Sequence, residues 1–132
     1  MTDLQLRAFG AIALACLLAA PVWAHHSFAA QYDSSKPVEM RGTVTKVEWT
    51  NPHARIYIDV KDDTGQVVNW NFEMASPNIL LRNGWRQNTV KAGDQITVTG
   101  YLARKNARMA IASTVADANG KPIFASNPDI TR

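Results

Sequence analysis

The sequence has 132 residues, one cysteine and a formal net charge of +3, from 14 Lys and Arg against 11 Asp and Glu. This length fits one domain with a modest core. The charge is too small to indicate a nucleic-acid-binding protein by itself. A single cysteine excludes a disulfide framework within the chain.

Residues 1–24 are typical of a secretory signal peptide. Arg7 precedes an almost wholly apolar run, which ends in small residues at Val22 and Ala24, as signal peptidase requires. The run is shorter than a membrane-spanning helix and contains a proline, so we expect no permanent membrane anchor. Cleavage after Ala24 would remove Cys16 and place the mature protein in the periplasm or outside the cell.

Residues 25–37 are interpreted as an N-terminal arm that leads into the domain. From Phe28 onward this segment is polar and shows no periodic pattern. The arm would begin with His25 and His26, the first two residues of the mature protein.

Alternating apolar residues predict three strands after the arm. The segment GTVTKVEW is rich in β-branched residues, and in RIYIDV apolar residues alternate with polar ones such as Arg55 and Tyr57. A turn at DDTG leads to VVNWNFEM, where the alternation puts Trp70 in the core and Glu73 on the wet face. The last two strands therefore form a hairpin.

A helix and two more strands complete the domain. SPNILLRNGW predicts a short helix with Ser76 at its N-cap, Pro77 at its first position and Gly84 at its end. QITVTGYLA and RMAIASTV then alternate as a fourth and fifth strand.

The element order β-β-β-α-β-β is that of the OB-fold. The sequence therefore predicts an all-β domain with one short helix, an OB-like five-stranded Greek-key barrel over residues 38–125. An open meander or a small sandwich with the same strands is the alternative. Residues 126–132 are expected to form a flexible tail.

Four segments carry a family resemblance: HHSFAAQYD, GTVTKVEWTNPH, NWNFEMASPNILLRNGW and KAGDQITVTGYLAR. They resemble a family of small secreted bacterial proteins recorded as a domain of unknown function. In that family the His-His start and the Asn-Pro-His motif recur, here as His25, His26, Asn51, Pro52 and His53. The resemblance implies a signal peptide, a periplasmic or secreted location and an OB-like barrel, and it brings no established activity.

His25, His26 and His53 are the candidate metal ligands. A mature chain that starts at His25 offers an amine and an imidazole on one residue, and an imidazole from His26 or His53 would complete a nitrogen set suited to Cu(II). This arrangement resembles the histidine brace of copper oxygenases and copper carriers. The alternatives are a solvated N-terminus, copper binding by the terminal residues alone, and a His53 that hydrogen-bonds the backbone of its loop.

The loop around His53 is also the candidate site for a small ligand, because the connection between the first two strands borders the usual binding face of an OB-fold. Trp49, Asn51 and Tyr57 are its candidate contacts, with core packing as the alternative for the two aromatic residues.

The sequence contains no G-x-S-x-G, no H-E-x-x-H and no phosphate-binding glycine loop, so we do not expect an enzyme. The leading hypothesis is a periplasmic binding module for a small ligand, a metal ion such as copper, or an envelope protein. A copper-dependent redox enzyme and a structural or adaptor protein of the cell envelope are the alternatives. Nucleic acid is not expected as a partner because of the predicted location.

Overall fold

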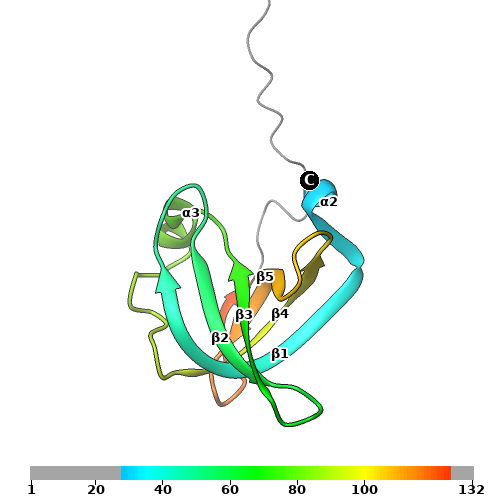
Figure 1. The fold of residues 1–132 in the computed structure, drawn as a ribbon. Coiled ribbons are helices and arrows are strands. Elements are labelled where there is room, and N and C mark those ends of the chain that lie inside the picture. The colour runs from blue at the N-terminus through cyan, green and yellow to red at the C-terminus, as the bar shows by residue number, and fades with distance from the viewer. Residues whose placement is uncertain (1–27, 126–132) are drawn as a thin grey trace, which may run out of the picture.

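The computed structural model describes residues 28–125, which form one curled sheet with two short helices (Figure 1). The predicted signal peptide, His25, His26 and the predicted tail lie outside the described residues. In chain order the elements are α2 (Phe28–Gln31), β1 (Tyr32–Glu48), β2 (Arg55–Lys61), β3 (Val67–Glu73), α3 (Pro77–Arg82), β4 (Gln95–Ala103), β5 (Met109–Ala116) and β6 (Pro122–Ala125).

The sheet closes into a barrel. Its six strands follow the order β3-β2-β1-β4-β5-β6, and β3 also pairs with β5. The closing pair is parallel and joins residues 71–73 to residues 109–111. The predicted OB-like barrel is therefore confirmed, with one strand more than predicted, because β6 pairs with β5 near the C-terminal end.

The long strand β1 corrects the predicted arm. β1 begins at Tyr32, so residues 32–37 belong to the sheet and not to an irregular lead. Tyr32 pairs with Ala103 of β4. All four residues from Ser34 to Pro37 are exposed. Because none of them faces the core, the sequence shows no alternation of apolar and polar residues here, and this part of the strand was not predicted.

Helix α3 forms where the sequence predicts it. The side chain of Ser76 accepts a hydrogen bond from the Ile79 amide at 3.4 Å, and Pro77 occupies the first turn. Gly84 follows with a φ of +87°, a conformation that glycine adopts without strain. Neither α3 nor any other helix in the described part of the chain has the length and apolar character needed to cross a membrane.

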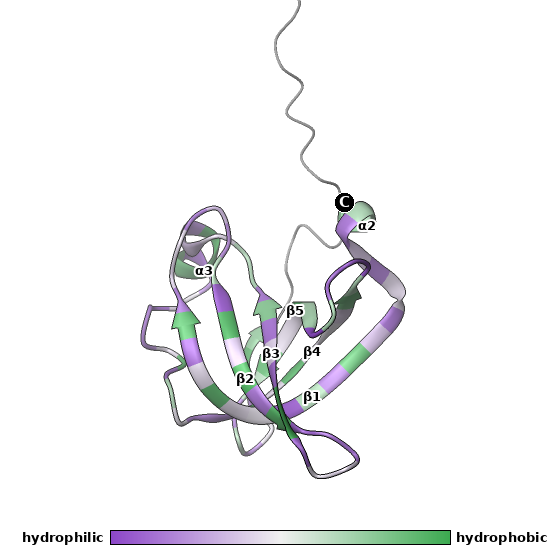
Figure 2. Cartoon of the chain, viewed as in Figure 1, coloured by the Kyte–Doolittle hydropathy of each residue, from purple (hydrophilic) through white to green (hydrophobic). Residues whose placement is uncertain are grey.

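Buried side chains from all six strands and α3 fill the barrel. Figure 2 shows hydrophobic and hydrophilic residues alternating along β1 and β2. Trp70 packs against this core but is only partly buried, which corrects its predicted central position, whereas Phe72 is fully buried. The core includes Val44, Ile56, Ile58, Phe72, Met74, Leu80, Trp85, Ile96, Val98, Val115 and Phe124.

Candidate functional site

Glu73, the last residue of β3, is the buried charged residue of the described chain, with 6% of its surface exposed. Its neighbour in register on β2 is Arg55, whose Nη2 donates a hydrogen bond to Glu73 Oε2 at 2.8 Å. Arg55 Nη1 donates to Asn71 Oδ1 at 3.3 Å. The guanidinium thus compensates the buried carboxylate, and the predicted solvent-facing position of Glu73 is wrong.

His53 lies beside Glu73. Its Nδ1 is 3.2 Å from the carbonyl oxygen of Met74, and its Nε2 is 3.9 Å from Glu73 Oε1. Because a carbonyl can only accept, the contact with Met74 assigns the proton of a neutral imidazole to Nδ1 and leaves Nε2 as an acceptor. The backbone contact predicted as one alternative for His53 is therefore present.

Tyr32, the first residue of β1, completes this group. Its side chain is buried, and its Oη has no hydrogen-bond partner within residues 28–125. Burial, and next the negative charge of Glu73, raise the pKa of Tyr32 well above its usual range, while Arg55 acts in the opposite direction. Glu73 is thus close enough to affect the ionisation of the hydroxyl, although the two side chains make no regular hydrogen bond.

These side chains gather at one end of the barrel. The start of β1, the loop between β1 and β2, and the end of β3 lie at the top in Figure 1. We call this region, defined by Tyr32, His53, Arg55 and Glu73, the Tyr32 end.

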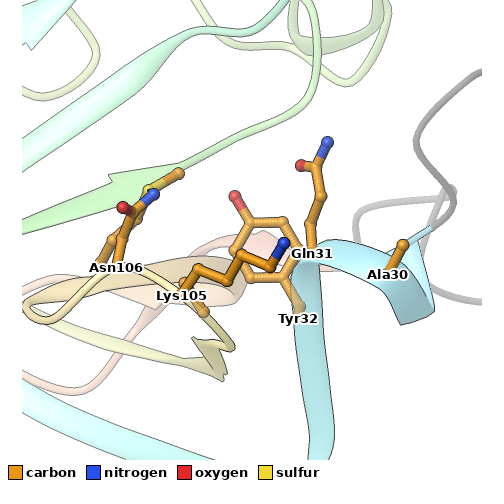
Figure 3. A pocket seen from close by; sticks show the side chains of 7 residues that line it. Ala30, Gln31, Tyr32, Lys105 and Asn106 are labelled. Atoms are coloured by element: carbon orange, nitrogen blue, oxygen red, sulfur yellow. The ribbon is translucent and has the colours of Figure 1, made fainter.

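A cavity of about 250 Å³ opens beside Tyr32. Tyr32 supplies part of the cavity wall. Of the four residues that define the Tyr32 end, it is the one that lines the cavity. In Figure 3 the Tyr32 hydroxyl points between the side chains of Asn106 and Gln31, and Lys105 crosses in front of the ring. We call this space the Tyr32 cavity; its lining residues are Ala30, Gln31, Tyr32, Ala103, Lys105, Asn106 and Met109.

Backbone contacts hold the two walls of the Tyr32 cavity together. Arg104, in the loop between β4 and β5, donates its amide to the Gln31 carbonyl and its Nε to the Ala29 carbonyl, both at 2.8 Å. Arg108 has a φ of +65°, which is uncommon for a residue other than glycine. Its carbonyl accepts from the Asn71 amide at 3.0 Å, so the loop is tied to α2 and to β3.

The predicted ligand contacts do not line the Tyr32 cavity. Trp49 is partly buried against the core, in agreement with the packing alternative. Tyr57 donates to Glu48 Oε2 at 3.0 Å, and Lys46 Nζ lies 5.3 Å from its ring centroid. Asn51 is exposed in the loop between β1 and β2.

The described residues do not form a metal centre by themselves. Within residues 28–125, no three His, Cys, Asp or Glu side chains gather in a group that could hold a metal ion. Of the three histidines predicted as copper ligands, His53 lies in this part of the chain, and His25 and His26 lie outside it. The copper site stays a prediction.

The residues of the Tyr32 cavity and the burial of Glu73 were not predicted from the sequence. One signal pointed to Glu73, because the carboxylate lies between Phe72 and Met74 in an apolar context and Ala75 follows. No comparable signal marks Lys105 or Asn106, which lie in a short polar loop.

Comparison with known proteins gives a family and likenesses of fold. The sequence matches the model of a family described as "Family of unknown function (DUF6152)" over residues 13–112, in agreement with the resemblance found in its motifs. No curated protein matches it.

Solved structures similar to this chain include the following three. The mitochondrial single-stranded DNA binding protein Rim1 of S. cerevisiae has 13% identity and a TM-score of 0.48 in one crystal form, covering 63% of this chain and 92% of its own. A second form has 13% identity and a TM-score of 0.46, covering 69% and 96%. A complex of TiaS with a transfer RNA and ATP has 18% identity and a TM-score of 0.46, covering 64% of this chain and 18% of its own. Each is a likeness of fold alone.

Proposed function

The chain belongs to a family of unknown function, DUF6152, and we propose that it is an exported binding protein that holds a small ligand in the Tyr32 cavity. Ligand binding is inferred from the geometry of the Tyr32 end. Export rests on the apolar segment that ends at Ala24.

The observation that carries this proposal is that Tyr32 belongs both to the cavity wall and to the buried polar group. A buried hydroxyl without a partner is uncommon in folded proteins, and it calls for an explanation such as strain, a bound water or ion, or a functional role. Pockets that combine an apolar wall with a few polar groups are the usual sites for small molecules.

Binding is favoured over catalysis by the contacts of the charged groups. The hydrogen bonds of Arg55 are directed to Asn71 and Glu73, and His53 faces the Met74 carbonyl through Nδ1. A catalytic acid or base needs a position from which it reaches a reacting atom, and neither His53, Arg55 nor Glu73 lines the Tyr32 cavity.

Backbone-amide NMR on protein purified from the periplasm tests the proposal. The probes are benzoate, benzamide and benzylamine, which share one ring of a size that suits the cavity and differ in the charge of the head group. At least one of them should shift the amide signals of Gln31 and of residues 103–109 in a saturable way. If none of the three probes shifts these signals, the proposal is wrong.

Two alanines of α2 provide a matched pair of variants. Ala30 lines the cavity and Ala29 does not, although both are exposed. Ala30→Leu should weaken the binding of the probes because the larger side chain takes up part of the cavity, and Ala29→Leu should leave the binding unchanged. Equal loss in both variants would place the probe elsewhere on the surface.

Copper binding is a second candidate function, favoured by the position of His53. The imidazole keeps Nε2 available as a ligand atom, and a hydrogen bond from the other ring nitrogen to a backbone carbonyl is the usual support of a metal-binding histidine. Phe28 stacks on Tyr32 with ring centroids 5.8 Å apart. His25 precedes Phe28 by three residues, so at about 3.3 Å per residue the chain between them spans at most roughly 10 Å.

Calorimetric titration with Cu(II) tests this second function. A site that includes His53 should bind Cu(II) more tightly than the free peptide His-His-Ser-Phe, and His53→Ala should remove most of this advantage. If His53→Ala leaves the affinity unchanged, the terminal residues bind copper alone, and the folded site does not exist.

A further inference from the structure

We propose that the Tyr32 cavity takes a small carboxylic acid with an apolar body. This inference rests on the proposed function, because it names the chemical class of ligand for the same cavity. Three features support it: the charge at the rim, the hydrogen-bond donors beside that charge, and the apolar wall.

The charge at the rim is positive. Lys105 is the charged residue in the cavity lining, and within residues 28–125 it makes no ion pair. The carboxylate of Asp33 is held by Arg104 at 3.4 Å and by Lys36 at 3.8 Å. Arg55 is paired with Glu73, and among the lining residues it is Lys105 that carries a cation to meet a ligand anion.

Two carboxamides lie beside this cation. Gln31 and Asn106 line the cavity, and Figure 3 shows both side chains at its rim together with Lys105. Asn106 Nδ2 donates to Met109 Sδ at 3.5 Å. A thioether sulfur is a weak acceptor, so this N–H can turn to a carboxylate oxygen at little cost.

The remaining wall is apolar. The ring of Tyr32, the side chain of Met109 and two alanines, Ala30 and Ala103, provide it. A methionine adapts its shape to the group that it contacts. The volume of about 250 Å³ limits the body to about one ring or a short branched chain, so the complete ligand is an acid of roughly the size of benzoate.

The three probes separate this class from its alternatives. Benzoate should bind most tightly, benzamide about three-fold more weakly and benzylamine more weakly still, because an exposed ion pair contributes up to about five-fold in affinity. In Lys105→Gln the affinity for benzoate should fall to that for benzamide, whereas the affinity for benzamide should not change.

Lys121→Gln is the matched control, since it removes the same charge from an exposed lysine outside the Tyr32 cavity. It should leave the preference for benzoate intact.

The outcomes distinguish the ligand class from the proposed function. If benzamide or benzylamine binds as tightly as benzoate, or if Lys105→Gln keeps the preference for benzoate, the acid class is wrong and small-ligand binding at this cavity stands. If no probe binds at the cavity, both proposals are wrong.

Discussion

Arg55 and Glu73 face each other across β2 and β3, and Arg55 Nη2 donates to Glu73 Oε2 at 2.8 Å. Their side chains are 27% and 7% exposed, so the pair is largely withdrawn from water. It lies where β3 pairs with β2 on one side and with β5 on the other. A buried carboxylate at this point needs its cation, because an unpaired charge in the interior is strongly destabilising.

Arg55→Met should lower the free energy of unfolding by about 2–4 kcal/mol, because it leaves Glu73 buried without its partner. The double variant Arg55→Met/Glu73→Met should recover most of this loss, since both charges are then absent. Urea unfolding at neutral pH measures both variants. An equal loss in the single and the double variant would contradict the pairing.

The alternation of residues along single strands predicted most of the barrel, because each strand carries its own inward face. Ile56 and Ile58 are buried as predicted, and α3 begins at Ser76 and Pro77, whose signals are local. Glu73 could not be predicted in this way. Tyr32, which lies beside Glu73, comes from a distant part of the chain and belongs to a segment without periodicity.

Above about pH 10, ionisation of Tyr32 should make the protein less stable. The raised pKa of Tyr32, due first to burial, means that the unfolded chain loses this proton before the folded one does. The stabilising contribution is therefore complete below about pH 10 and is lost progressively as the pH rises above that value.

Tyr32→Phe tests this dependence. The variant should unfold at nearly the same urea concentration as the natural protein at neutral pH, because the hydroxyl has no partner to lose. At alkaline pH the variant should lose less stability than the natural protein. The alkaline loss that remains includes a part from Tyr57, whose pKa is also raised, chiefly by burial. If both proteins lose the same stability at alkaline pH, the pKa of Tyr32 is not raised by folding.

Gly100→Ala should disrupt the pairing of β4 with β5. A Cβ at this position would overlap the carbonyl oxygen of Ile111, at a point where the register between the strands shifts. Since backbone atoms cannot move aside cheaply, we expect a loss of about 3 kcal/mol or more in thermal or urea unfolding.

Gly120→Ala is the control for Gly100→Ala. Gly120 has a φ of +80° and open space around it, so this variant should cost only the conformational penalty of about 1–2 kcal/mol. If the Gly100 variant is as stable as the Gly120 variant, β4 and β5 do not approach each other as closely at Gly100 as the structure shows.

Phe72→Ala should destabilise the barrel more than Trp70→Ala. Phe72 is fully buried, and truncation of such a residue costs about 3–5 kcal/mol. Trp70 is only partly buried at the edge of the core, so its truncation should cost about 1–3 kcal/mol. The urea midpoints of the two variants show which of them is less stable. A larger loss of stability for Trp70→Ala would contradict the central position of Phe72 in the core.

The residues of the proposed ligand site were harder to predict than the fold. Gln31 and Lys105 come from opposite parts of the chain, and the contact of Arg104 with the Gln31 carbonyl brings their segments together. For His53, predicted as a metal ligand, the contact with backbone was one of the alternatives, and this contact is present. The closure of the barrel decides which distant segments meet at its end. A local sequence pattern does not contain this information.

The most direct test of the account is a crystal structure of the protein soaked with para-bromobenzoate. The anomalous signal of bromine would locate the ligand independently of the protein atoms. We predict one strong peak in the Tyr32 cavity, with the ring against Met109 and the carboxylate toward Lys105. A cavity without a peak, with bromine bound only at other surfaces, would contradict the assignment of this cavity as the binding site.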